Sequence, residues 1–107
     1  MKAKLMFPLL GAVLVSGCAF VKLNPQADDV LVLKPYQVRE CEQLRRSTSQ
    51  VMHKIWFVNR NQERMAEELA TLARNTAAEL GGNAVVADSP IEEGRQRFVI
   101  YNCPSLR

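Results

Sequence analysis

The architecture of this 107-residue chain shows most clearly in one stretch of it, Leu72-Ala73-Arg74-Asn75-Thr76-Ala77-Ala78-Glu79-Leu80-Gly81-Gly82-Asn83-Ala84-Val85-Val86. Its first half completes a helical pattern that starts near Gln62, in which apolar residues recur every three or four positions along one stripe. This stripe consists of Met65, Leu69, Leu72, Ala73, Thr76 and Leu80, and it is widened by the small residues Ala66, Ala70 and Ala77. Asn61 suits an N-cap, and Gly81 stands where a helix ends in a left-handed residue. We therefore expect a helix over residues 62–80 and a sharp turn at residues 81–83.

Further segments on both sides of the helix have the composition of strands. They are residues 30–33, a poorly alternating segment within 42–52, residues 84–87 and residues 97–103. The last strand is expected to run antiparallel to its neighbour, and residues 52–58 either to extend the second strand or to fold over the core as a loop. The order strand, strand, helix, strand, strand predicts an α+β fold, a small sheet of about four strands with one long helix packed on one face.

The N-terminus has the pattern of an export signal. Lys2 and Lys4 precede a short apolar run that is followed by Ser16, Gly17 and Cys18. This run is too short to span a bilayer, which needs about 20 apolar residues. The small residues before Cys18 resemble the lipobox of bacterial lipoproteins. The resemblance implies thioether lipidation of Cys18, cleavage before it and acylation of the new amino terminus, whereas an ordinary signal peptide would leave the cysteine incidental.

These features predict three parts of the chain: a signal peptide over residues 1–17, a lipidated tether over residues 18–29 and a single α+β periplasmic domain over residues 30–107. Pro25 and the pair Asp28-Asp29 favour an irregular tether. Ala19 follows the lipidated cysteine, where an aspartate commonly retains enterobacterial lipoproteins in the inner membrane. By that analogy we expect the outer membrane, with the domain on its periplasmic face.

Charge gives little support for a nucleic-acid partner. The net charge of +3 includes Lys2 and Lys4, and without them the 14 basic residues fall to 12 against 11 acidic residues. A nearly neutral domain lacks the clustered positive charge that phosphate backbones attract. Binding to nucleic acid is therefore not expected.

The remaining cysteines, Cys41 and Cys103, form an even pair in a compartment expected to be oxidising. We expect a disulfide, with two free thiols or a metal site as the alternatives. A Cys/His catalytic pair needs a free thiolate, and His53 is the chain's lone histidine. We therefore expect no enzyme activity, no catalytic residue, no metal and no cofactor, and we expect His53 to be a surface or loop residue.

The stretch 72–86 resembles the helix-to-strand pattern of small proteobacterial lipoproteins with a domain of unknown function, close to L-R-N-x-A-A-x-L-G-A-N-x-V. These proteins also tend to carry a cysteine before the second strand and an aromatic-x-Cys ending, as Cys41 and Tyr101-Asn102-Cys103 do here. Residues 56–61 resemble their pre-helix loop. The chain departs from the family at Leu44-Arg45, where Leu-Gly is usual, and at residues 51–55, where a glycine-rich loop is usual. The architecture also resembles that of the outer-membrane sensor lipoprotein of the Rcs envelope-stress phosphorelay.

Trp56, Phe57 and Arg60 are the candidate partner-binding residues, because aromatic side chains beside an arginine suit a recognition patch. The alternative is that the aromatic residues fill the core. We expect an outer-membrane-anchored periplasmic lipoprotein of non-enzymatic role, attached through its N-terminal lipid, that binds an envelope protein or peptidoglycan. The alternatives are an envelope-stress sensor or regulator acting by protein contact and, more weakly, a metal-binding or redox-active thiol protein. The oligomeric state is not predicted.

Overall fold

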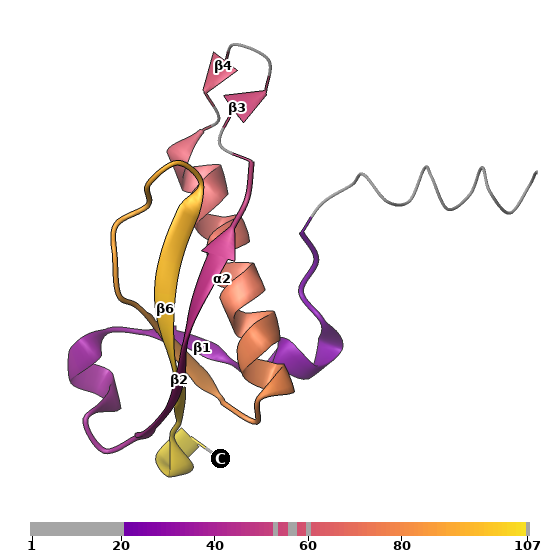
Figure 1. The fold of residues 1–107 in the computed structure, drawn as a ribbon. Coiled ribbons are helices and arrows are strands. Elements are labelled where there is room, and N and C mark those ends of the chain that lie inside the picture. The colour runs from indigo at the N-terminus through magenta and orange to yellow at the C-terminus, as the bar shows by residue number, and fades with distance from the viewer. Residues whose placement is uncertain (1–20, 53, 56–57, 60, 107) are drawn as a thin grey trace, which may run out of the picture.

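A four-stranded mixed sheet, in the order β1-β5-β6-β2, forms the centre of the domain (Figure 1). This computed structural model describes residues 21–52, 54–55, 58–59 and 61–106. The strands are β1 (Leu31–Leu33), β2 (Glu42–Gln50), β5 (Ala84–Ala87) and β6 (Arg95–Asn102). Strand β1 pairs in parallel with β5, and β6 pairs antiparallel with both β5 and β2. The α+β fold and the expected order of strands and helix are confirmed.

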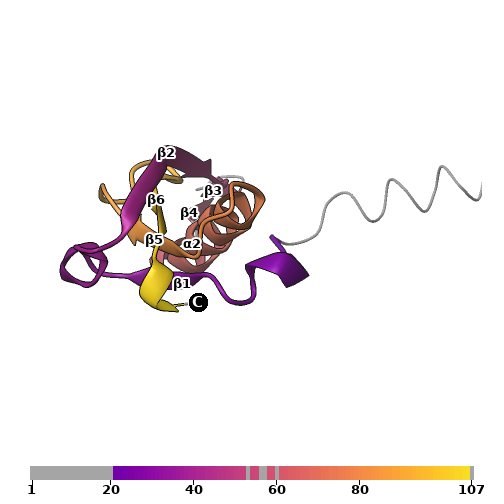
Figure 2. The same ribbon diagram turned by 90° about the horizontal axis from the view of Figure 1, so that it is seen from below.

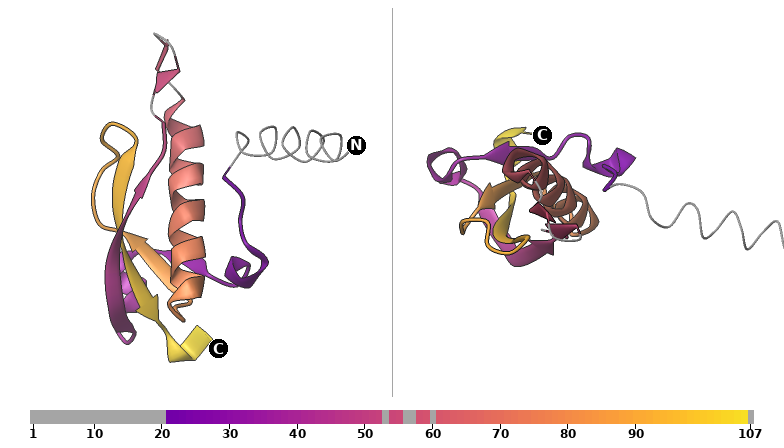
Figure 3. Two further views of the ribbon diagram at one scale, coloured as in Figure 1. Left: turned by 45° about the vertical axis from the view of Figure 1, so that its right-hand side comes forward. Right: turned by 90° about the horizontal axis from the view of Figure 1, so that it is seen from above.

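The predicted long helix is α2 (Gln62–Glu79), which lies along one face of the sheet (Figure 3). The Asn61 side chain accepts a hydrogen bond from Arg64 N at 3.2 Å, as expected of an N-cap. At the other end Leu80 is the C-cap, Gly81 has a φ of 80°, and Gly82 N donates to Ala77 O at 2.8 Å. The helix therefore stops through a left-handed residue, as the sequence predicts. No helix within the described ranges is both long and apolar enough to cross a membrane.

The described residues within 52–58 differ from both expectations, because Lys54–Ile55 (β3) and Val58–Asn59 (β4) pair as a separate antiparallel hairpin. This hairpin projects beyond the sheet at the N-terminal end of α2 (Figure 1). Strand β2 cannot extend into it, because β6 starts at Arg95 and offers no partner backbone further on. Val51 N donates to Gly94 O at 2.7 Å, at the turn that precedes β6.

The larger hydrophobic core lies between α2 and the sheet. On the helix, Leu69, Ala73 and Ala77 are fully buried. They pack with side chains of β5 and β6 and of the N-terminal segment, namely Val85, Phe98, Ile100, Ala27 and Val30. Alanine at two of the three helix positions lets the helix backbone approach the sheet closely, which explains why the helical stripe is rich in small residues.

The opposite face of the sheet is also partly covered, which the sequence did not reveal. The short 3-10 helix η2 (Pro35–Val38) places Val38 over the sheet, where it packs with Ala84, Val86 and Cys103. The disulfide between Cys41 and Cys103 fixes this cover to the end of β6, and the predicted pairing is therefore present. Strand β5 is buried on both faces as a result, in keeping with its run of apolar residues.

Residues 22–29, predicted as part of an irregular tether, instead pack together with Val30 against α2. The Asn75 side chain accepts from Asn24 N and donates to Lys22 O, each at 2.8 Å. The Arg74 guanidinium donates to three backbone carbonyls, of Val30 at 2.7 Å, of Asp28 at 3.1 Å and of Ala27 at 3.2 Å. We call these two side chains the Arg74–Asn75 clamp. The segment forms the 3-10 helix η1 (Pro25–Ala27) and buries Ala27 and Val30, which explains why it is ordered despite its charged residues.

We predict that Gly82→Ala destabilises the domain by about 1–3 kcal/mol, because it overpacks the helix-to-strand turn. A Cβ at this position would lie 2.7 Å from Ile100 Cγ2 and 2.9 Å from Tyr101 O, and the latter is backbone of the central sheet. The measurement is the free energy of unfolding in urea. Gly81→Asn is the matched control, because Gly81 has open space around it and asparagine tolerates a positive φ. An equal loss in both variants would contradict the steric account.

We predict that Cys41→Ser lowers the free energy of unfolding by about 4 kcal/mol, the chain-entropy value for the loop that the disulfide closes. The two cysteines are 62 residues apart in sequence. Urea unfolding measures the loss, and a thiol probe added during unfolding should label Cys103 in the variant but not in the oxidised wild type. Wild type treated with a reductant should behave as the variant does. Equal stability, or no new labelling of Cys103, would contradict the pairing.

Candidate functional site

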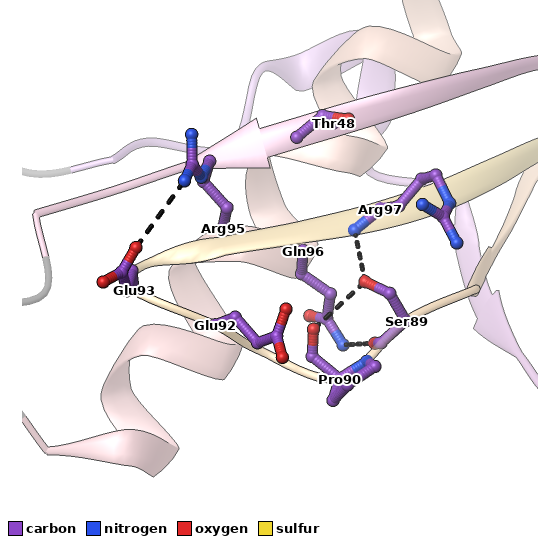
Figure 4. A pocket seen from close by; sticks show the side chains of 8 residues that line it. All are labelled: Thr48, Ser89, Pro90, Glu92, Glu93, Arg95, Gln96 and Arg97. Carbon is purple, nitrogen blue, oxygen red and sulfur yellow. Dashed lines mark hydrogen bonds and ion pairs between the residues drawn. The ribbon is translucent and has the colours of Figure 1, made fainter.

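A well-defined hollow lies where loop 88–94, which joins β5 to β6, bends back beside β6 and β2. Its volume is about 680 Å³. Figure 4 shows the side chains that line it, which are Thr48, Ser89, Pro90, Glu92, Glu93, Arg95, Gln96 and Arg97. Most of these are polar or charged, so the hollow is suited to a hydrated or charged ligand more than to an apolar one.

Strand register brings the arginines of the hollow to one face of the sheet. Thr48 is paired with Arg97, and Gln50 with Arg95. Directly paired residues share a face, and this face is opposite to the one on which Phe98 packs against α2. Thr48, from the polar run of β2 that gave no clear strand pattern in the sequence, therefore belongs to the exposed wall of the hollow.

A tight turn positions the acidic side of the hollow. Glu92 and Arg95 exchange two backbone hydrogen bonds at 2.9 and 3.0 Å, and the intervening Glu93 and Gly94 both have positive φ, 51° and 75°. Positive φ at both central residues is the geometry of a type I′ hairpin turn, which matches the twist of the strands. Residues 92–95 therefore form a type I′ hairpin turn. It places the Glu93 carboxylate 3.7 Å from an Arg95 guanidinium nitrogen.

Next to the hollow, Asp88 joins two arginines from neighbouring strands. Its Oδ2 accepts from Arg97 Nε at 3.1 Å and lies 3.6 Å from Arg46 Nε. The Arg97 side chain is 50% exposed and that of Arg46 62%, so each ion pair contributes at most about 1 kcal/mol to stability. These guanidinium groups stay accessible, and a guanidinium binds planar carboxylates through two parallel hydrogen bonds.

Ser89 is one of the hydroxyl residues of the hollow, and its hydrogen bonds hold the loop in place. Its Oγ donates to Pro90 O at 3.0 Å and accepts from Arg97 N at 2.9 Å, while Gln96 Nε2 donates to Ser89 O at 3.0 Å. A hydroxyl used in this way holds the wall of a binding site, whereas a nucleophile needs a base within hydrogen-bond reach. Across the described part of the chain, no three His, Cys, Asp or Glu side chains come together in a way that could hold a metal ion.

The residues expected from the sequence fall into two groups. Cys41 and Cys103 are joined at the other end of β6, and Cys103 is fully buried. The candidate partner-binding residues Trp56, Phe57 and Arg60, together with His53 and Cys18, lie outside the described residues. The two aromatic residues follow β3 directly in sequence and precede β4.

A second, shallower hollow links the first one to the base of the hairpin. Its lining residues are Gln50, Val51, Met52, Glu93 and Arg95, so it shares Glu93 and Arg95 with the first hollow. Met52 is 63% exposed and comes two residues before β3. We call the combined surface of Thr48, Gln50, Met52, Glu93, Arg95 and Arg97 the distal surface. Sequence reasoning missed it because it depends on the register between β2 and β6.

Comparison with known proteins assigns the chain to a sequence family. No curated protein and no solved structure matches it. The family model described as "Domain of unknown function (DUF4156)" matches residues 21–103, which is nearly all of the described chain. The match begins with the segment that the Arg74–Asn75 clamp holds and ends at the second cysteine of the disulfide. The chain belongs to the DUF4156 family.

Proposed function

We propose that this protein is a lipoprotein anchored in the outer membrane through Cys18, facing the periplasm, with a non-enzymatic role in binding a partner of the cell envelope. The observation that carries the proposal is the disulfide between Cys41 and Cys103, because disulfides persist in exported proteins and are rare in reducing compartments. It supports the interpretation of residues 1–17 as an export signal, which rests on the sequence.

The distal surface is the part of the described domain that suits a partner best. It combines a polar hollow with exposed Arg95 and Arg97 and with an exposed methionine, Met52. Exposed arginines beside a hollow favour a partner that presents carboxylates, as acidic protein segments and the peptide stems of peptidoglycan do. The β3–β4 hairpin starts at this surface, and Trp56 and Phe57, the partner-binding residues proposed from the sequence, fall between its two strands in the sequence.

The proposed anchor predicts that Cys18→Ser releases the protein from membranes, because the thioether link to lipid needs the cysteine sulfur. The measurement is the distribution of the protein between the membrane pellet and the soluble periplasmic fraction. Cys41→Ser is the control for loss of a cysteine elsewhere, and it should remain in the pellet. The anchor assignment fails if Cys18→Ser pellets with membranes as wild type does.

The proposed interface predicts that a photoreactive residue at Trp56 forms adducts with one envelope component, and that Arg95→Glu reduces the yield several-fold by repelling a carboxylate-bearing partner. Arg39→Glu is the matched control, because Arg39 is also exposed but lies next to η2. Mass spectrometry identifies the trapped material. A signalling protein would favour a sensor, and peptidoglycan fragments would favour a wall-associated role. Equal yields from both arginine variants would contradict a role for the distal surface.

A further inference from the structure

The Arg74–Asn75 clamp leaves the domain very little slack between its folded part and the anchor. The clamp bonds reach Lys22 O, so the chain is held to α2 from residue 22 onward. The intervening residues, from Cys18 to Lys22, extend over no more than about 14 Å even when fully stretched. If Cys18 carries lipid, the side of the domain where residue 22 lies is held next to the membrane surface.

From residue 22 the chain continues through η1 and β1 to η2, and the described chain ends in the C-terminal 3-10 helix η3 (Pro104–Leu106). Seen along the long axis of the domain in Figure 2, the N-terminal segment, β1 and the C-terminus line one side, and β2 lies on the other. The view from the opposite end in Figure 3 agrees. We call the side formed by residues 22–36 and 104–106 the β1 flank.

Most of the large apolar side chains that the described structure exposes are on the β1 flank. Val32 is 51% exposed, Tyr36 64%, and Leu31 and Leu106 44% each. Strand β1 is also an edge of the sheet, because β5 is its neighbour on one side and the order of strands ends with it. Leu31 and Val32 flank this free edge from the two faces of the sheet, so a surface that meets β1 edge-on contacts both side chains.

The charges of the β1 flank are mixed, since Lys22 and Lys34 accompany Asp28 and Asp29. A flank of this kind gains little from attraction to anionic headgroups. Apolar and aromatic side chains can still enter the interfacial layer of a bilayer, where tyrosine is favoured. The short tether thus keeps the β1 flank close to the bilayer, and the apolar side chains of the flank contact the bilayer's interfacial layer.

We propose that the β1 flank lies against the lipid surface and that the short tether and the clamp hold the domain in this one orientation. This inference rests on the proposed lipidation of Cys18. In this orientation β2, three strand spacings or roughly 14 Å from β1, faces away from the membrane. Leu31, Val32 and Tyr36 then contact the lipid interface.

The test places a photoreactive phenylalanine derivative at Val32 in the full-length protein in cells, with the same residue at Thr48 on β2 as the matched control. Both positions are exposed and both lie in edge strands. Phospholipid adducts are counted by mass spectrometry in the membrane fraction. We expect an excess of about fivefold or more at Val32, because the far edge of the sheet lies roughly 14 Å away.

A second variant tests the cause of the orientation without touching the folded part. Eight Gly and Ser residues inserted between Val21 and Lys22 add up to about 28 Å of reach. The insertion should reduce the excess at Val32 to near the level at Thr48, and Asn75→Ala should reduce it in part by loosening the clamp. Because Asn75→Ala removes hydrogen bonds within the domain, its result is used only if its circular dichroism spectrum matches that of wild type. The insertion needs no such check, because it leaves the clamp intact.

The outcomes separate this inference from the anchor itself. Equal lipid adducts at Val32 and Thr48, in a protein that pellets with membranes, would overturn the orientation and leave the anchor standing. Adducts at Val32 with a second copy of the chain would overturn it in favour of a dimer through β1. An excess at Val32 that survives the insertion would overturn the role of the short tether. If wild-type protein does not pellet with membranes, the proposed lipid anchor is wrong, and the orientation that rests on it falls with it.

Discussion

The carboxamide of Asn83 ties together the parts of the fold that are distant in sequence. Its Nδ2 donates to Cys103 O at 2.9 Å, and its Oδ1 accepts from Cys103 N at 2.7 Å. Its backbone accepts from Leu31 N and donates to Tyr101 O, each at 3.0 Å. One nearly buried residue thus fixes the start of β1, the entry to β5 and the end of β6. An unpaired buried group of this kind costs about 1–3 kcal/mol, which makes Asn83 hard to replace.

The pattern shared with related sequences describes a scaffold rather than a ligand site. Arg74 and Asn75 hold the N-terminal segment, Ala77 lets α2 approach the sheet, and Gly82 touches Ile100 and the backbone of Tyr101. Each position has a packing or hydrogen-bonding reason of its own. The interpretation of residues 81–83 as a fold element is therefore supported by their contacts, and features that serve a partner are to be sought elsewhere, in the distal surface and the β3–β4 hairpin.

Sequence reasoning succeeded where a signal is local and failed where it is not. The caps and apolar stripe of α2, the turn at residues 81–83 and the strand containing Val85 follow from neighbouring residues. The docking of residues 22–30 does not, because the clamp bonds backbone carbonyls 44 to 53 positions away, and a carbonyl carries no information about residue type. The distal surface was missed for a related reason, since the polar side chains of β2 gain meaning only from their register with β6.

In the proposed arrangement the clamp holds the domain near its anchor and the distal surface binds the partner. The length of α2 separates the two. Asn61 and Asn75 cap and clamp opposite parts of this helix, about 21 Å apart along its axis. A domain held by a four-residue link near Asn75 therefore presents its hairpin and hollow at a fixed distance to the side, parallel to the membrane. In this arrangement Thr48 and Gln50 of the distal surface, which belong to β2, face away from the membrane and are open to a partner on the periplasmic side. The same scaffold on a long, slack tether would search a larger volume but would lose this fixed direction, which is the advantage that ordering residues 22–30 confers.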